Sequence, residues 1–322
     1  MKTILLTNKY TGAPLKLVTE EVPNGFEIRF LTQQTQEALV NEAGRADYIL
    51  AGGRLKITED VLENAERLRM IQRSGVGLDA LDLDAIKKKG IPLYVNQGVN
   101  AESVAEHTLL LMLASLRRLT LIDKNTKSGI WNKQEQGVRT AELRGKTIGV
   151  IGMGNVAQTL VKLLKPFGVT VLYNNLFRMP DEFERENNMR FVAMDELLGD
   201  SDIITIHCAL TDETRNLINA GSIGKMKDGA ILINTARGEI IDPDAAANAL
   251  RTGKLSFAGL DVHYKEPFPE DYPLKNAENV ILTPHIAGVT ADSFRAMMHD
   301  AFRNIECFDR GDLEAIAPFR YL

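Results

Sequence analysis

The stretch T-I-G-V-I-G-M-G-N-V-A at residues 147–157 decides the fold of half of this chain. An apolar run leads into G-x-G-x-x-A, and an amphipathic segment at residues 156–167 follows directly. In such a strand–turn–helix unit, the first glycine permits a tight turn and the second lets the backbone approach a pyrophosphate. A small third residue allows the helix to pack closely on the strand. The pattern predicts a dinucleotide-binding turn that contains Gly152, Gly154, Asn155 and Val156.

Short aliphatic runs alternate with amphipathic stretches on both sides of this turn. This βαβ alternation predicts an α/β protein with parallel sheets covered by helices. The expected strands are 3–6, 48–51, 70–73 and 93–95 in the first part, and 147–151, 170–173, 203–206, 230–233, 257–260 and 280–282 in the second. A long buried helix is expected at about 103–119, and another helix at about 291–309.

The chain has 322 residues, which is long for one core, and its texture changes near residue 99. The simplest interpretation is a discontinuous substrate (catalytic) domain made of residues 1–98 and 289–322. The dinucleotide-binding domain, residues 99–288, is then inserted into it. We expect a small-molecule site in the cleft between two such domains.

Composition argues against several other classes of protein. The net charge of −5 gives no reason to expect nucleic acid or an anionic membrane as a partner. Two cysteines and no cluster of cysteine and histidine favour a reducing compartment and no metal. The longest apolar run, at 109–114, is far below the roughly 20 residues that span a bilayer. Residues 1–8 read as a strand and not as a signal peptide, so we expect a cytoplasmic protein.

Three segments in the second half carry the reactive side chains: I-N-T-A-R-G at 233–238, G-L-D-V-H-Y-K-E-P at 259–267 and T-P-H-I-A-G at 283–288. Arg237 has a planar cation that holds a carboxylate with two hydrogen bonds and polarises a carbonyl. His285 brings an imidazole, a group suited to proton transfer near neutral pH, and Glu266 is its natural partner. Taken singly, Arg237 also fits a surface salt bridge and His285 a structural loop residue.

The acid that usually binds the adenosine ribose, about 20 residues after the glycine turn, is missing. The strand at 170–173 ends in two asparagines instead. Asn175 can donate to a ribose hydroxyl and would not repel a 2′-phosphate, with which Arg178 could pair. The other interpretation of Arg178 is a solvated loop cation. The choice between NAD and NADP stays open, with NAD and relaxed discrimination favoured.

The remaining histidines are weaker candidates. His207 ends a predicted strand, where it could border the cofactor. His107 is expected to be a helix core residue with a satisfied hydrogen bond, His299 to lie on a helix surface, and His263 has no evident role.

Together these segments resemble the D-isomer-specific 2-hydroxyacid dehydrogenases, almost from end to end. S-G-V-G at 74–77, N-A-E-S-V-A-E at 100–106 and H-C-A-L-T at 207–211 add to the match, as does M-K-D-G-A-I-L before the arginine segment. The resemblance implies two Rossmann-like domains and reversible hydride transfer between a 2-hydroxy acid and its 2-keto acid. Arg237 would anchor the substrate carboxylate, Glu266 would tune His285, and His285 would exchange the proton.

The resemblance also assigns binding residues and a partner. It implies that the backbone of Val76 and Gly77 binds the substrate carboxylate. It implies a homodimer formed by the 103–119 helix and the segment around Trp131. Residues that it places near the cofactor are Cys208, Thr214, Thr235, Ala236, Asp261 and Gly288.

The sequence leaves the substrate open among glyoxylate, hydroxypyruvate and 3-phosphohydroxypyruvate. Arg54 is the cation that would bind a distal phosphate, unless it faces solvent. A second hypothesis is a dinucleotide-sensing scaffold with little turnover, similar to corepressors that keep this fold. A third is an enzyme acting on formate, because that group resembles the same family.

Overall fold

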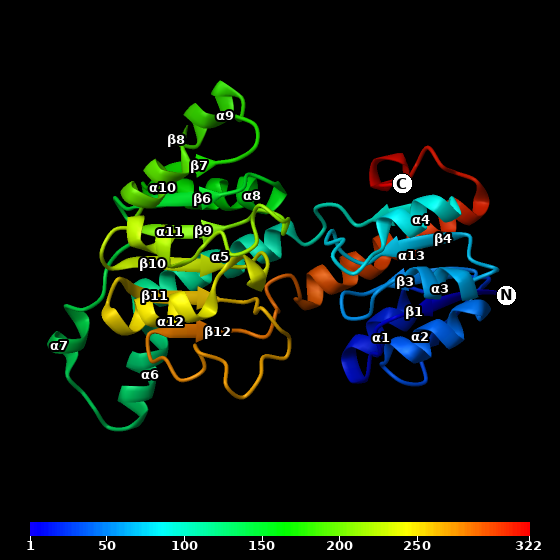
Figure 1. Ribbon diagram of the computed structural model, residues 1–322, viewed down its shortest axis with the longest axis horizontal. Coiled ribbons are helices and arrows are strands. Elements are labelled where there is room, and N and C mark those ends of the chain that lie inside the picture. Colours follow the sequence, from blue (N-terminus) through cyan, green and yellow to red (C-terminus); the bar gives the residue numbers. More distant parts are fainter. The chain divides into compact units, whose positions relative to one another are not determined.

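The computed structural model describes residues 1–322, and the chain divides into two compact units. Unit 1 consists of Met1–Asn100 and Val289–Leu322, and unit 2 of Ala101–Gly288. Each unit has its own parallel sheet with helices on both faces (Figure 1), which confirms the predicted α/β class. None of the helices combines the length and the apolar character that a bilayer crossing requires.

Unit 1 is built on a five-stranded sheet in the order β2-β1-β3-β4-β5. Its strands are β1 (Lys2–Leu6), β2 (Phe26–Phe30), β3 (Tyr48–Ala51), β4 (Met70–Arg73) and β5 (Leu93–Val95). Its helices are α1 (Gly12–Glu20), α2 (Gln36–Glu42), α3 (Glu59–Asn64), α4 (Leu83–Lys89) and α13 (Ala291–Arg310), with short 3-10 turns η1 (Ala43–Arg45) and η4 (Ala317–Phe319).

Successive residues of these strands point into two different cores. Leu5 and Ile49 pack in the core that α2, α3 and α4 share, whereas Ile4 and Tyr48 pack in the core that contains α1 and α13. Strand β2 was not predicted. It lies at the edge of the sheet, where its side chains are only partly buried and its sequence signal is weak.

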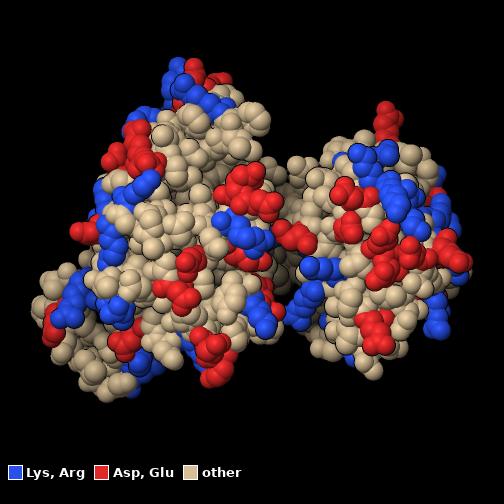
Figure 2. Space-filling model, in the orientation of Figure 1, with Lys and Arg blue, Asp and Glu red and all other residues tan.

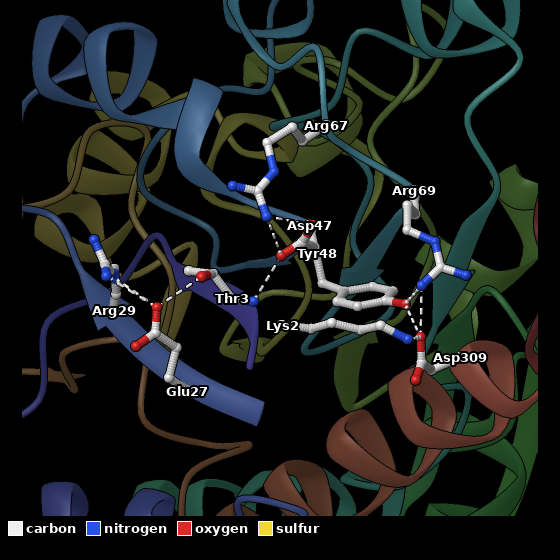
Figure 3. A network of polar contacts seen from close by, with 9 residues as sticks. All are labelled: Lys2, Thr3, Glu27, Arg29, Asp47, Tyr48, Arg67, Arg69 and Asp309. Atoms are coloured by element: carbon white, nitrogen blue, oxygen red, sulfur yellow. Dashed lines mark hydrogen bonds and ion pairs between the residues drawn. The ribbon is translucent and has the colours of Figure 1, made fainter. Parts of the chain in front are cut away.

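Helix α13 is tied to the amino ends of the strands by a charged network (Figure 3). Asp309, near the end of α13, accepts from Tyr48 Oη at 2.7 Å and from Arg69 Nη1 at 2.5 Å, and it also pairs with Lys2. Burial acts to raise the pKa of Asp309, but these three donors outweigh it and bring the pKa to about 2. The network therefore joins α13, near the C-terminus, to the sheet of unit 1, whose first strand β1 begins at Lys2.

Unit 2 contains seven parallel strands in the order β12-β11-β10-β9-β6-β7-β8. They are β6 (Thr147–Ile151), β7 (Thr170–Asn174), β8 (Met189–Phe191), β9 (Ile203–Ile206), β10 (Ala230–Asn234), β11 (Leu255–Leu260) and β12 (Val280–Leu282). The helices are α5 (Ala101–Leu116), α6 (Leu119–Lys127), α7 (Lys133–Gly137), α8 (Asn155–Leu164), α9 (Asp181–Glu186), α10 (Met194–Asp200), α11 (Ala220–Lys225) and α12 (Pro243–Thr252), with 3-10 turns η2 (Lys165–Phe167) and η3 (Gly238–Ile240).

The strand order of unit 2 reverses between β6 and β9. Chain connections run from β6 outward through β7 and β8 on one side and from β9 outward to β12 on the other. In open parallel sheets, ligands bind outside the carboxyl ends of the strands at such a switch point. Helices α5 and α8 cover one face of the sheet and α10, α11 and α12 the other, so the carboxyl edge is the part left to loops.

The predicted helix at 103–119 is wrong at its end. Helix α5 stops at Leu116, and Arg118 adopts a left-handed conformation with φ of 49° before α6 begins. The expectation of a helix buried on most faces holds except along one narrow stripe, where Glu102, Glu106 and Leu110 are exposed. Leu111 and Met112 lie in the core, whereas Leu110 is 53% exposed. A run of leucines hides this difference, because every face looks apolar in the sequence.

Charged side chains are distributed over both units. On the face drawn in Figure 2, lysine and arginine are interspersed with aspartate and glutamate. Several of these charges are paired locally, as Lys225 is with Asp195 at 2.7 Å. Exposed pairs of this kind contribute little to stability, roughly 0–1 kcal/mol each.

Candidate active site

The candidate residues of unit 2 follow six different strands at their carboxyl ends. The glycine turn follows β6, Asn175 follows β7 and His207 follows β9. Arg237, Asp261 and His285 come shortly after β10, β11 and β12. Because all seven strands are parallel, these loops share one edge of the sheet.

The turn after β6 has the form that a dinucleotide needs. Gly152 has φ of +89°, and a Cβ there would lie 2.5 Å from the Cys208 backbone nitrogen, so only glycine fits. A Cβ on Gly154 would meet nothing within 4 Å, so no protein contact demands glycine there. Open space at this position is what the close approach of a pyrophosphate requires.

Helix α8 supplies the second feature of this phosphate cradle. Its N-terminus has no side-chain cap, so the first N–H groups, including those of Asn155 and Val156, have no acceptor within the helix. Such a helix end attracts anions. The residues present therefore fit a dinucleotide phosphate group.

The end of β9 lies directly against this turn. The His207 N–H donates to the Ile151 carbonyl at 2.7 Å, and the His207 ring pairs with the Thr205 hydroxyl at 2.9 Å. Burial lowers the pKa of His207 to about 4 and raises that of the Cys208 thiol to about 11. Both groups are therefore neutral at physiological pH, which suits a border for the cofactor and not an acid, base or nucleophile.

The loop after β7 differs from one interpretation of the sequence, the solvated loop cation. Asn175 Oδ1 accepts from the Met153 N–H at 3.2 Å and its Nδ2 donates to the Phe177 carbonyl at 2.9 Å, so the side chain braces the glycine turn. Arg178 is not a simply solvated cation. It donates to both carboxylate oxygens of the buried Glu184, at 3.0 and 2.7 Å. Sequence reasoning missed this pair because it depends on the path of the loop.

Arg237 leaves β10 through a turn held by Asn234. The buried Asn234 side chain accepts from the Ala236 N–H at 2.9 Å and donates to the Arg237 carbonyl at 2.8 Å. A Cβ on Gly238 would lie 2.0 Å from the His263 carbonyl carbon. Gly238 therefore lets the arginine loop pack against the loop after β11, which carries Glu266.

His285 and Glu266 form the pair that the sequence predicted. His285 Nδ1 lies 2.7 Å from Glu266 Oε2, and the two side chains are 48% and 36% exposed. A carboxylate accepts hydrogen bonds, so Nδ1 must carry the proton of this bond. The neutral imidazole then has its lone pair on Nε2, and the protonated form has a proton there to donate.

Glu266 is held by a second donor. Its Oε1 accepts from the His263 N–H at 3.0 Å. Burial acts to raise the pKa of Glu266, but the hydrogen bonds from the His285 ring and the His263 N–H outweigh burial and hold the pKa below its usual value. Glu266 is thus a carboxylate at neutral pH with each oxygen paired to one donor.

Asp261 organises the turn that presents His285. Its carbonyl accepts from the His285 N–H at 2.7 Å. Its fully buried carboxylate accepts from the Thr283 hydroxyl at 2.5 Å and from the N–H groups of Ile286 and Ala287 at 2.9 and 2.8 Å. His285 itself has φ of +55°, which is uncommon for a residue with a side chain. The buried carboxylate holds this turn in place.

His107, His263 and Thr283 meet near the site through contacts that the sequence did not predict. The His263 ring lies 3.0 Å from the Thr283 carbonyl and 3.3 Å from the Tyr272 hydroxyl. His107, expected in the helix core, reaches the Thr283 hydroxyl at 3.2 Å and lies 3.8 Å from Asp261. Each contact joins segments far apart in the chain, so no local pattern signals it.

The other predicted cofactor residues lie on the same loops of unit 2. The Thr235 hydroxyl bonds that of the buried Thr108 at 2.9 Å, next to Ala236. The Thr214 hydroxyl accepts from the Thr211 N–H at 2.7 Å and shapes the loop after β9. Gly288 ends the segment that begins at β12.

The substrate residues expected in unit 1 follow β3 and β4. Arg54 is exposed in the loop after β3. Val76 is 49% exposed in the loop after β4, and the Gly77 carbonyl accepts from Arg73 Nε at 2.7 Å. Arg73 also donates to the Ala51 carbonyl at 2.9 Å, so it joins the two loops. No role was predicted for Arg73.

A dinucleotide cradle, a carboxylate–imidazole pair and an arginine on one sheet edge define an oxidoreductase of the Rossmann type. Comparisons with known proteins identify the family. Residues 109–287 match the model of the D-isomer specific 2-hydroxyacid dehydrogenase NAD binding domain. The chain belongs to this family, whose cofactor is NAD.

Relatives differ in the activities that their names state. A D-3-phosphoglycerate dehydrogenase of Archaeoglobus fulgidus is 39% identical over 84% of this chain and 51% of its own length. A glyoxylate reductase of Thermofilum pendens is 38% identical over 87% of this chain and 83% of its own. This chain thus spans about half the length of the first relative and most of the second.

A solved structure supports the fold over the whole chain. The D-lactate dehydrogenase of Aquifex aeolicus, in complex with NAD and lactic acid, has a TM-score of 0.88 at 31% identity. The similarity covers 99% of this chain and 98% of that protein.

Proposed function

We propose that this protein reduces a short 2-keto acid to the D-2-hydroxy acid with NADH, and catalyses the reverse reaction. The observation that carries the proposal is the 2.7 Å bond between His285 Nδ1 and Glu266 Oε2. It fixes the tautomer that leaves Nε2 available for a substrate oxygen, on the same carboxyl edge of the sheet as the cradle suited to the dinucleotide.

In the reductive direction, protonated His285 donates its Nε2 proton to the carbonyl oxygen. Glu266 stabilises the protonated ring through Nδ1, and neutral His285 takes the proton back in the oxidative direction. The bound nicotinamide supplies or accepts the hydride. Asp261 holds the turn, so that the ring keeps one orientation during this exchange.

Arg237 is the residue that we propose for the substrate carboxylate. Its guanidinium can form two parallel hydrogen bonds with a carboxylate, which fixes the orientation of the neighbouring carbonyl. Its charge also stabilises the negative charge that develops on that oxygen. The exposed backbone of Val76 and Gly77 is proposed to bind the substrate as well.

We assign NAD binding to residues 99–288 and substrate binding to residues 1–98 and 289–322. The proposed substrate is a 2-keto acid such as glyoxylate, hydroxypyruvate or 3-phosphohydroxypyruvate. The names of the relatives support this range and do not choose within it.

A homodimer through α5, α6 and α7 is also proposed. Several apolar side chains on these helices and their connections face solvent: Leu110, Leu119, Ile130, Trp131 and Val138. A group of exposed apolar residues is typical of a surface that another protein covers. Sedimentation of the purified chain would measure its mass in solution, and a monomer at micromolar concentration would contradict this proposal.

The test of function is steady-state oxidation of NADH with glyoxylate, hydroxypyruvate, 3-phosphohydroxypyruvate and pyruvate. Turnover with one of these acids that His285→Gln abolishes, while NADH still binds, is the expected result. His299→Gln is the matched control, because His299 lies on the surface of α13 and pairs with Glu21. Dinucleotide binding without turnover on any acid would favour a sensing scaffold.

A further inference from the structure

We propose that Glu184 sets the coenzyme preference by holding Arg178 away from the 2′-phosphate of NADP. This inference rests on the proposed dinucleotide-dependent reaction and concerns the loop that joins β7 to α9. The ribose of a dinucleotide is recognised at the end of this strand, where an acid usually contacts its 2′-hydroxyl and a nearby arginine accommodates a 2′-phosphate.

Arg178 is the only basic residue between Asn174 and Glu184. It is 59% exposed but makes a two-bond contact, in which Nε donates to Glu184 Oε1 at 3.0 Å and Nη2 to Oε2 at 2.7 Å. Asp181 lies 3.3 Å from the same Nη2. Two of the guanidinium nitrogens, Nε and Nη2, are therefore already directed at carboxylates.

Glu184 cannot follow the arginine outward, because it is anchored from the sheet side. Its side chain is 8% exposed, and Tyr173 Oη donates to its Oε1 at 2.6 Å. Tyr173 is buried in β7 and accepts from the Met179 N–H at 2.7 Å. If Arg178 turned to a 2′-phosphate, it would leave a buried carboxylate without its counter-charge, which is strongly unfavourable.

In this proposal, the Arg178–Glu184 pair takes the place of the acid that usually binds the ribose as the source of selectivity for NAD over NADP. Asn175 carries no charge to repel a 2′-phosphate, and both of its polar atoms bond the backbone. Repulsion comes instead from Asp181 and Glu182 in the first turn of α9. We infer that the chain prefers NADH, although the sequence favoured relaxed discrimination.

The test is Glu184→Gln, which keeps an acceptor for Tyr173 and removes the charge that holds Arg178. Dissociation constants for NADH and NADPH are measured by nicotinamide fluorescence, without substrate. We expect NADPH affinity to rise about tenfold or more, the value of one charge-assisted contact, with NADH affinity within about twofold. The double variant Arg178→Gln/Glu184→Gln should lose this gain.

Arg190→Gln is the matched control, since Arg190 pairs with Glu196 at 2.6 Å in the same unit. It should leave the ratio of the two constants unchanged. An unchanged ratio in Glu184→Gln, with normal NADH binding, would overturn the proposal. So would a selective loss of NADPH affinity in Arg178→Gln alone.

The unmodified protein gives an independent readout that does not depend on the folding of variants. In competition with NADH, adenosine 2′,5′-bisphosphate (2′,5′-ADP) should bind no better than 5′-AMP, which differs from it only by the 2′-phosphate. Tighter binding of 2′,5′-ADP by about tenfold would overturn the proposal, because Arg178 would then already bind the phosphate. Absence of NADH binding in the unmodified protein would instead refute the dinucleotide function itself.

Discussion

Replacing Glu266 by glutamine keeps the length of the side chain and removes its charge, and we expect this change to remove most of the activity. Glu266 Oε2 receives the His285 Nδ1–H at 2.7 Å and Oε1 receives the His263 N–H at 3.0 Å. Both neighbours donate, so two acceptor oxygens satisfy them. A glutamine amide has one acceptor and one donor group, so in either orientation one contact becomes donor against donor as long as Nδ1 keeps its proton.

The size of the effect follows from the bond that is lost. A hydrogen bond to a charged group contributes about 1.5–3 kcal/mol, and the low end applies here because both side chains are more than a third exposed. A loss of about 1.5 kcal/mol in the transition state lowers kcat roughly tenfold. If the amide donates to Nδ1, the neutral ring carries its proton on Nε2 and cannot accept one. Oxidation should therefore lose more than reduction.

The assay measures kcat in both directions between about pH 6 and pH 9, with NADH affinity as the control. The pKa of Glu266 lies below its usual value, so the carboxylate is charged throughout this window and its removal is felt at every pH. Rates within twofold of the unmodified protein in both directions would refute the proposed role of Glu266.

Three other substitutions test the fold and the cofactor turn. Asp309→Asn should cost about 2 kcal/mol of unfolding free energy at pH 7, from a pKa of about 2 in the fold against 3.8. Since the folded pKa is depressed, this stability is present above about pH 4 and lost toward pH 2. Urea unfolding measures the free energy of unfolding of both proteins. A difference between variant and unmodified protein that stayed constant between pH 4 and pH 2 would contradict the depressed pKa of Asp309. Gly238→Ala places a Cβ 2.0 Å from the His263 carbonyl carbon and should destabilise by about 1–3 kcal/mol in thermal melts. Gly224→Ala meets nothing within 4 Å and is its control. Gly154→Ala should leave the melting temperature unchanged and weaken NADH binding about tenfold, measured by fluorescence. An unaltered dissociation constant would place the pyrophosphate elsewhere.

The features that the sequence predicts well are those that arise within one strand–turn–helix unit. The glycine turn is one, because the conformations of Gly152 and Gly154 and the start of α8 depend on neighbouring residues. The same holds for the strands of the two sheet interiors, which read as short apolar runs because helices cover both faces. Edge strands such as β2 and β8 lack that signal.

Contacts between loops could not be predicted in this way. His107, His263 and Thr283 meet only after α5, β11 and β12 have packed together, and none has a distinctive neighbour in the sequence. The partner of Arg178 could not be predicted either, although the two residues are close in the sequence. The charge of Arg178 suggested a phosphate partner, but its Nε and Nη2 groups donate to the buried Glu184, six residues away.

The structure also gives a physical reason for the roles of two acids on the loop after β11. Glu266 is partly exposed and bonds the His285 ring, whereas the Asp261 carboxylate is buried and accepts from the two backbone N–H groups that follow His285 and from the Thr283 hydroxyl before it. An exposed ring in a left-handed turn has few contacts of its own to hold it. The orientation of the His285 ring therefore depends on the backbone that carries it, and the buried Asp261 carboxylate holds that backbone in place. On this basis, Asp261→Asn should lower kcat with NADH affinity retained, because one backbone N–H would face the amide donor. A parallel loss of NADH affinity would show that Asp261 also contacts the cofactor.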